Sequence, residues 1–177
     1  VPFSRIISYN LSMKTILYMA TTINGYIAKE NDDTSFVSKE SWESFDELSK
    51  KAGNLIIGRR TFEISIKDNT FPYPQRLNIV MTHDKVENKW GGNVLFTNKS
   101  PKEVLKILEE KDFDTAFIGG GGSINSAFMK EGLVDEIYLD VEPIVFGKGI
   151  KLFTGQDFEI SLELLETNKL NKNTIQL

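Results

Sequence analysis

Short apolar runs alternate with helix-like segments along most of this chain. The apolar runs predict strands at residues 14–20, 54–57, 78–82, 93–97, 115–118, 135–142, 158–167 and 174–177. Helices are predicted at residues 39–51, after Gly58, from 101 to about 111, and at 123–130. Ser38 can cap the first of them, and Ser100 and Glu103 form a capping box at the start of the third, with Pro101 at its first position. Alternation of this kind favours a sheet that is covered by helices on both faces. We therefore predict a three-layer α/β fold with a mixed, mostly parallel central sheet.

The last two predicted strands are separated only by a short turn at residues 168–173. Parallel neighbours need a long crossover connection, so this short turn predicts an antiparallel C-terminal hairpin. A chain of 177 residues is long enough for one domain with a substantial core. We place that domain at residues 13–177. Residues 1–12 do not have the pattern of a signal peptide, and we interpret them as a disordered or artificial extension.

Composition excludes several kinds of chemistry. The chain has no cysteine and one histidine, His83, which excludes disulfides, thiolate metal sites and cysteine nucleophiles and disfavours a Ser-His-Asp triad. The net charge of −4 gives no support for a nucleic-acid partner, and no apolar segment is long enough to span a membrane. We expect a cytoplasmic protein without a metal site, which acts on a small molecule through carboxylates, lysines or a bound cofactor.

Four glycines, Gly119 to Gly122, lie between the predicted strand 115–118 and the predicted helix 123–130. Glycine lets the backbone approach a ligand closely, and a helix N-terminus offers free N–H groups to an anion. This junction favours a phosphate or pyrophosphate site, although a tight turn would also explain one or two of the glycines. The dinucleotide fingerprint G-x-G-x-x-G is not met, because its third glycine position is Ile124.

A second junction of this type lies at Gly58-Arg59-Arg60-Thr61, where a strand leads into a predicted helix. The planar fork of arginine suits phosphate, and positive charge at a helix start is unfavourable unless an anion is present. Two solvated arginines are the simpler alternative. Together with the glycine run, this junction predicts an extended ligand with more than one phosphate group.

Several segments, taken in order, resemble dihydrofolate reductase. They are residues 20–27, residues 57–62 (Ile-Gly-Arg-Arg-Thr-Phe), residues 76–82 and residues 118–121. Residues 132–137 and 143–149 look instead like the reductase domain of the bifunctional riboflavin-biosynthesis deaminase–reductase and its stand-alone relatives. The resemblance covers residues 13–177 and implies a dihydrofolate-reductase-like fold, the cofactor NADPH and a homodimer formed through the C-terminal strands.

The resemblance implies a set of cofactor-binding residues. Gly58, Arg59, Arg60 and Thr61 would hold phosphates, Thr82 and His83 would flank the adenosine ribose, and Gly119, Gly120, Gly121, Gly122, Ser123 and Ile124 would accept the pyrophosphate. Ala20, Gly25 and Ile27 would line the nicotinamide, and Ile118 would touch both nicotinamide and substrate. His83 has an alternative as an exposed loop residue.

The substrate side departs from the dihydrofolate reductase pattern. The resemblance implies substrate contacts at Asn24, Trp42, Phe45, Arg76 and Ile118, with Arg76 at the place of an arginine that holds the substrate tail. The expected helix acid falls near Ser41, Trp42 or Glu43, and we interpret Glu43 as a solvated charge.

Asp140 is our candidate for the catalytic proton source, because a carboxylate among the apolar residues of a strand needs a reason to be there. An edge position or a salt bridge would also explain it. We predict an NADPH-dependent reductase that transfers a hydride to a pteridine or a ribosylaminopyrimidine. The alternatives are a non-catalytic NADPH-binding protein and an NAD-linked Rossmann dehydrogenase, which Arg59 and Arg60 disfavour.

Overall fold

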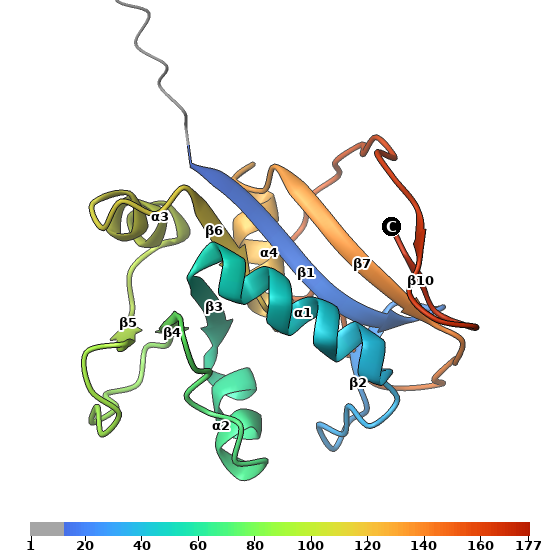
Figure 1. Cartoon of the computed structure of the whole chain (residues 1–177), viewed down its shortest axis with the longest axis horizontal. Coiled ribbons are helices and arrows are strands. Elements are labelled where there is room, and N and C mark those ends of the chain that lie inside the picture. Colours follow the sequence, from blue (N-terminus) through green and yellow to red (C-terminus); the bar gives the residue numbers. More distant parts are fainter. Residues whose placement is uncertain (1–12) are drawn as a thin grey trace, which may run out of the picture.

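The computed structural model describes residues 13–177, so the predicted extension at residues 1–12 lies outside the described residues. Figure 1 shows the elements in chain order. The strands are β1 (Lys14–Thr22), β2 (Tyr26–Ala28), β3 (Asn54–Gly58), β4 (Leu77–Met81), β5 (Val94–Thr97), β6 (Thr115–Ile118), β7 (Glu136–Glu142), β8 (Ile150–Lys151), β9 (Asn168–Lys169) and β10 (Ile175–Gln176). The helices are α1 (Lys39–Ala52), α2 (Arg59–Lys67), α3 (Pro101–Glu109) and α4 (Gly122–Lys130).

The central sheet has eight strands in the order β5-β4-β3-β6-β1-β7-β10-β9. The six strands from β5 to β7 pair in parallel, and β10 and β9 add antiparallel pairs at one end. Strands β2 and β8 form a separate two-stranded sheet. The predicted mixed, mostly parallel sheet with an antiparallel C-terminal hairpin is confirmed.

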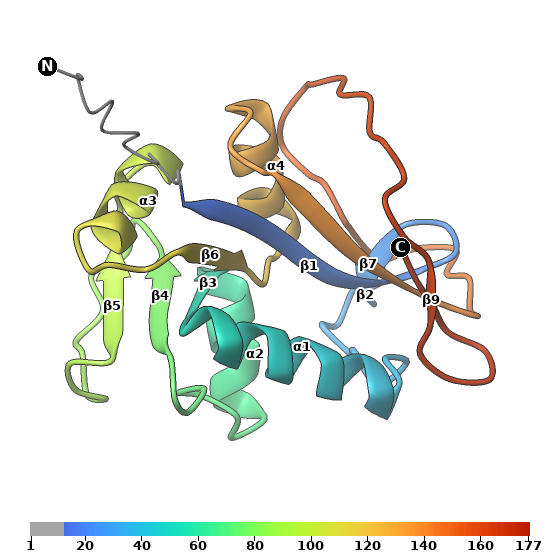
Figure 2. The same cartoon turned by 45° about the horizontal axis from the view of Figure 1, so that its top comes forward.

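Helices cover both faces of the sheet, which confirms the three predicted layers. Helices α1 and α2 lie on one face, and α3 and α4 on the other (Figure 2). Right-handed crossovers require this division, because the chain moves one way along the sheet through α1 and α2 and back through α3 and α4. The core under α1 and α2 is rich in aromatic residues, including Tyr18 and Phe117, and the core under α3 and α4 contains Leu108 and Phe128.

Helix ends follow the sequence signals at α1 and α3. The Ser38 side chain accepts a hydrogen bond from the backbone N–H of Ser41. Ser100 and Glu103 form the predicted capping box, with Pro101 at the start of α3. Each cap pairs backbone donors that would otherwise lack a partner at a helix N-terminus.

The strand predicted at residues 158–167 is absent from the structure. Residues 157–167, which we call the arm, run without regular structure, and none of them makes a backbone–backbone hydrogen bond with another described residue. Leu162, Leu164 and Leu165 are 68%, 67% and 71% exposed. The apolar alternation that predicted a strand is present, but none of the strands within residues 13–177 pairs with it. Figure 2 shows the arm curving away from β7.

Candidate active site

One large cavity lies at the C-terminal ends of the parallel strands β1, β3, β4 and β6. It has a volume of about 1640 Å³, larger than the pockets that hold most single small ligands. At these strand ends β3 leads into α2 on one face of the sheet, whereas the adjacent β6 leads into α4 on the other face. Such a topological switch point opens a crevice between the two connections, where α/β proteins bind ligands.

Two helices begin at this crevice without a side-chain cap. The N-cap residues of α2 and α4 are Gly58 and Gly121, and neither helix start has a side-chain capping bond. Helices α1 and α3, in contrast, are capped by serines. An uncapped helix leaves its first N–H groups and the positive end of its dipole available to an anion. Residues at the starts of α1 and α3 also line the cavity, so the absence of a side-chain cap is what distinguishes the starts of α2 and α4 from them.

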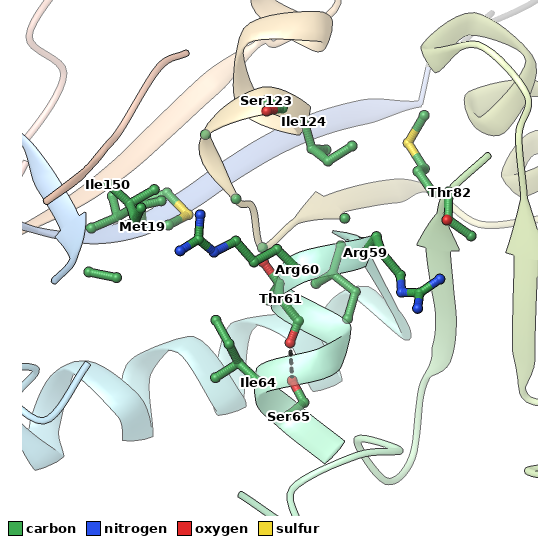
Figure 3. A pocket seen from close by; sticks show the side chains of 18 of the residues that line it. Met19, Arg59, Arg60, Thr61, Ile64, Ser65, Thr82, Ser123, Ile124 and Ile150 are labelled. Atoms are coloured by element: carbon green, nitrogen blue, oxygen red, sulfur yellow. Dashed lines mark hydrogen bonds between the residues drawn. The ribbon is translucent and has the colours of Figure 1, made fainter. Parts of the chain in front are cut away.

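The turn between β3 and α2 is hydrogen-bonded directly to the turn between β6 and α4. The backbone N–H of Gly58 donates to the carbonyl oxygen of Gly120 at 2.8 Å. A Cβ atom on Gly58 would lie 2.8 Å from Cγ1 of Ile124, and a Cβ on Gly119 would lie 2.6 Å from Cδ1 of Leu55. Packing therefore explains both glycines without a ligand, against the other turn for Gly58 and against β3 and α1 for Gly119. Figure 3 shows Ile124 reaching from α4 toward the start of α2.

Gly120 and Gly121 differ in what surrounds them. Gly120 has a φ of +90°, and its Cβ would lie 2.7 Å from the Sδ atom of Met19, so both its conformation and the space demand glycine. Gly121 faces the cavity, and its Cβ would meet Oγ1 of Thr61 at 3.4 Å, an ordinary contact. The glycine run thus combines structural turn residues with an open backbone position at the cavity wall.

Arg59 and Arg60 leave the start of α2 in opposite directions (Figure 3). Arg59 forms ion pairs with Glu63 at 2.8 Å and Asp84 at 2.7 Å. Arg60 pairs with Asp32 at 2.5 Å. The anions that compensate these arginines in the structure are therefore carboxylates of the same chain. All five side chains of these ion pairs are substantially exposed to solvent, and exposed ion pairs are weak, so a phosphate group can compete for either arginine.

The structure brings most of the predicted cofactor residues to one cavity. Those that line it are Ala20, Ile27, Gly58, Arg59, Arg60, Thr61, Thr82, His83, Gly119, Gly121, Gly122, Ser123 and Ile124. Gly25, Ile118 and Gly120 do not line it. The Gly25 carbonyl accepts from the N–H of Leu152, and Ile118 is fully buried in the core. His83 is both exposed and at the cavity wall, so its two interpretations are compatible.

The predicted substrate residues are divided between the cavity and the protein interior. Trp42 and Phe45 line the cavity, with their rings in an edge-to-face contact. Arg76 does not: its buried guanidinium pairs with Asp46 and donates to Ser49, so its environment is that of a structural residue. Asn24 also lies away from the cavity, where its side chain is hydrogen-bonded to the backbone of Phe146. Glu43 pairs with Lys39 on the exposed face of α1, as expected of a solvated charge.

Asp140 is fully buried behind the part of the cavity wall formed by Tyr18, Ser41, Trp42 and Phe45, which we call the inner end of the cavity. Its Oδ2 accepts hydrogen bonds from the Tyr18 hydroxyl at 2.5 Å and from the Ser41 hydroxyl, and its Oδ1 accepts from Nε2 of Gln176 at 2.8 Å. Strand β7 lies between β1 and β10, so Asp140 is not at a sheet edge, and none of the ion pairs found within residues 13–177 includes it. Both alternatives to a functional role, an edge position and a salt bridge, are thereby removed.

Tyr18 and Ser41 line the cavity, whereas the Asp140 carboxylate lies behind them. Burial raises the pKa of Asp140 above its usual range, although its three hydrogen bonds act in the opposite direction. Burial and the bond to Asp140 likewise raise the pKa of Tyr18. Tyr18 and Ser41 are thus the cavity-lining residues whose hydroxyl groups are hydrogen-bonded to Asp140.

Sequence reasoning missed several residues of the site. Tyr18 and Gln176 were not singled out, although a polar side chain inside a buried strand requires a partner. Thr97 to Ser100, which follow β5, also line the cavity, as do Lys151 and Thr154 near β8. The β5 segment had a signal, since it follows the C-terminal end of a strand. Lys151 and Thr154 are brought in by the small β2–β8 sheet, whose pairing no local pattern predicts.

The contact between the two turns can be tested by substitution. We expect Gly58→Ala to lower the free energy of unfolding by about 1–3 kcal/mol, because the added methyl group overpacks against Ile124. In Gly58→Ala/Ile124→Ala part of this loss is recovered, because the space for the methyl group is restored. Urea unfolding of both single variants and the double variant measures the coupling. Strictly additive effects would contradict the contact.

The buried carboxyl predicts a pH-dependent stability. Because the folded pKa of Asp140 is raised, its contribution to stability is greatest below the unfolded pKa of about 3.9 and is lost as pH rises through the folded pKa. The unfolding free energy of the wild type minus that of Asp140→Asn should therefore decrease as pH rises in that interval. Urea unfolding at a series of pH values measures it, and an increase instead would contradict the assignment.

Asp46 provides a control of opposite sign. Its partial burial is outweighed by hydrogen bonds from Lys50 and Arg76, which lower its pKa. The contribution of Asp46 is therefore present above its unfolded pKa and is lost as pH falls through the folded value. The corresponding difference for Asp46→Asn should increase with pH, in the same series of measurements.

Comparisons with known proteins place the chain in a family. Residues 13–176 match the model of the RibD C-terminal domain. The Bacillus subtilis (strain 168) protein YwjB, described as uncharacterised, is 28% identical over 166 residues, which cover 92% of this chain and 95% of YwjB. Dihydrofolate reductase from Aedes albopictus is 27% identical over 136 residues, 71% of this chain and 72% of that protein.

The fold is also similar to solved structures. A Thermotoga maritima diaminohydroxyphosphoribosylaminopyrimidine deaminase/5-amino-6-(5-phosphoribosylamino)uracil reductase matches with a TM-score of 0.71 and 18% identity, over 93% of this chain and 55% of that chain. The family match extends from just before β1 into β10, so it includes both helix starts and Asp140. The chain belongs to the family of RibD C-terminal domains, within the dihydrofolate-reductase-like superfamily.

Proposed function

We propose that the protein is an NADPH-dependent reductase that transfers a hydride to a ribosylaminopyrimidine or, as the second candidate, to a pteridine. The observation that carries this proposal is the pair of uncapped helix starts, α2 and α4, which both line one large cavity. Two anion sites in one crevice suit a ligand with phosphate groups at more than one place. Family membership and the dihydrofolate reductase relative support an oxidoreductase.

The residues at the cavity fit the cofactor. The first turn of α4, from Gly122 to Ile124, would bind the pyrophosphate through backbone N–H groups. Arg59, on the side of Thr82, would hold the 2′-phosphate in place of its present carboxylate partners. Ala20 and Ile27 would form the apolar wall beside the nicotinamide. When bound, NADPH supplies the hydride, and the protein supplies orientation, a sheltered pocket and a proton.

The inner end of the cavity suits a flat heterocycle. Trp42 and Phe45 provide aromatic surface, and Tyr18 and Ser41 lie close to the buried Asp140. Hydride addition to a C=N or C=O carbon breaks the π bond and leaves a pair of electrons on the nitrogen or oxygen. One proton completes the reduction. We assign this proton to Asp140, relayed by the Tyr18 or Ser41 hydroxyl, with Asp140 protonated again from solvent.

A non-catalytic NADPH-binding protein is the alternative, and it is favoured by one observation: the Asp140 carboxylate does not itself reach the cavity. Titration with NADPH, followed by assays of NADPH oxidation with 5-amino-6-(5-phosphoribosylamino)uracil and with dihydrofolate, separates the two. We expect oxidation with the uracil substrate. Tight NADPH binding without oxidation by either compound would favour the binding protein and reject the reductase.

Cofactor choice provides a second test. Replacing Arg59 by Ala should raise the KM for NADPH about tenfold or more, since a charged hydrogen bond to the 2′-phosphate is lost, and should change the KM for NADH little. Lys67→Ala, at the opposite end of α2, is the matched control and should leave both values unchanged. A wild-type preference for NADH, or equal effects of Arg59→Ala on the two cofactors, would overturn the NADPH assignment.

We also propose that the protein forms a homodimer through its C-terminal region, with the arm as part of the interface. The arm exposes several large aliphatic side chains, and its backbone groups make no backbone hydrogen bond to the rest of residues 13–177, which are the features of a strand that lacks a neighbour. A second copy offers the same surface about a two-fold axis.

The oligomeric state follows from light scattering coupled to size-exclusion chromatography. We expect a dimer for the wild type and a monomer for the double variant Leu162→Asp/Leu164→Asp, because two carboxylates would be buried without partners in the interface. Ile66→Asp, which places the same charge on α2 far from the arm in the sequence, should remain dimeric. A monomeric wild type at micromolar concentration would reject the dimer.

A further inference from the structure

Gln176, the last residue of β10, is hydrogen-bonded directly to the buried Asp140 on β7. Its Nε2 lies 2.8 Å from Oδ1 of Asp140, 3.2 Å from the Tyr18 hydroxyl oxygen and 3.3 Å from the Ser44 hydroxyl oxygen. The residue is buried, with an exposed fraction of 7%. The cross-strand register places Gln176 directly opposite Asp140. Gln176 is not among the residues that line the cavity, so contact with a ligand there does not explain its amide.

The two oxygens of Asp140 have different partners. Oδ2 accepts from Tyr18 and Ser41, which line the cavity, whereas the hydrogen bond to Oδ1 comes from Gln176. A carboxylate with partners on one oxygen alone is held less firmly against rotation about its Cβ–Cγ bond than one with partners on both. The amide of Gln176 limits this rotation and pairs an acceptor that would otherwise be buried without a partner.

We propose that Gln176 is a positioning residue that holds Oδ1 of Asp140, so that Oδ2 stays on the two hydroxyl groups at the inner end of the cavity. The role in turnover rests on the proposed function, in which Asp140 supplies the proton. The hydrogen-bond geometry itself does not depend on that function. Gln176 acts through Asp140 and does not line the cavity.

The groups around Asp140 determine how its titration responds. Tyr18 faces it from β1, Ser41 and Ser44 lie on α1, and Glu142 lies two residues along β7. The Glu142 carboxylate is itself hydrogen-bonded to the Ser38 N–H and to the Thr174 hydroxyl. Gln176 is thus the amide donor that favours the ionised form of Asp140 from the β10 side.

The test replaces the amide and follows Asp140 directly. In Gln176→Met, which keeps the length of the side chain but donates no hydrogen bond, the acid dissociation constant of Asp140 should fall about tenfold, the typical effect of one hydrogen bond to a charged group. The measurement is the carboxyl carbon NMR titration of Asp140, assigned by the loss of its signal in Asp140→Asn. Gln176→Glu should shift the titration in the same direction, because a second carboxyl replaces the donor.

Ile175→Ala is the matched control. It changes the neighbouring position of the same strand, where the side chain is half exposed and belongs to the other face of the sheet. The Asp140 titration should be unchanged in this variant. An unaltered titration in folded Gln176→Met or Gln176→Glu would overturn the proposal, and so would an equal shift in Ile175→Ala, which would indicate a general disturbance of β10.

Turnover separates this proposal from the function on which it draws. In Gln176→Met the pH profile of kcat/KM should shift in the same direction as the Asp140 titration, while the Kd for NADPH stays unchanged. If no substrate is reduced by the wild type, the proposed function fails, and the NMR titration still decides the role of Gln176. If substrate is reduced but the kcat/KM profile of Gln176→Met is unshifted, the positioning role in turnover is rejected and the reductase assignment stands.

Discussion

The hydrogen bond from the N–H of Gly58 to the carbonyl of Gly120 is the contact on which the candidate site depends. It joins the turn after β3 to the turn after β6, although these turns lead to helices on opposite faces of the sheet. Close approach of the two turns leaves no room for a side chain on Gly58. The starts of α2 and α4 are fixed relative to one another by this contact, and so is the spacing of the two anion sites.

Capping residues show how the chain distributes stability and function. The starts of α1 and α3 carry serine caps, which pair their backbone donors within the protein. The starts of α2 and α4 carry glycine, which supplies no side-chain partner. Two of the four helices therefore leave polar groups for a ligand to pair with. The inner end of the cavity is different, because the hydrogen bonds of Asp140 are already made to Tyr18, Ser41 and Gln176.

Local sequence patterns predicted those features that depend on local physics. The three layers, the parallel sheet, the capping box at Ser100 and the two glycine-containing turns all follow from periodicity and helix-end chemistry, and the structure contains them. Most of the cofactor residues that the resemblance implied lie on the cavity wall. It placed Arg76 and Asn24 with the substrate, but ion pairing and backbone contacts hold both elsewhere.

Features that depend on long-range pairing were missed. Gln176 meets Asp140 only because β10 pairs antiparallel with β7, and a register shift of one residue would turn its side chain to the other face. The apolar alternation of residues 158–167 predicted a strand that the structure does not contain, because a strand also needs a neighbour. A pattern within one segment gives the conformation that the segment favours and leaves the identity of its partner open.

The ion pair between Arg60 and Asp32 has a consequence for how an anion enters the cavity. Asp32 lies in the segment between β2 and α1, and Arg60 lies in the first turn of α2, so the pair connects two walls of the cavity. An anionic ligand that takes the guanidinium from Asp32 exchanges one counter-charge for another. Binding at Arg60 therefore replaces the Asp32 carboxylate by the anion of the ligand, so the arginine stays neutralised. The segment around Asp32 loses one of the contacts that hold it to α2.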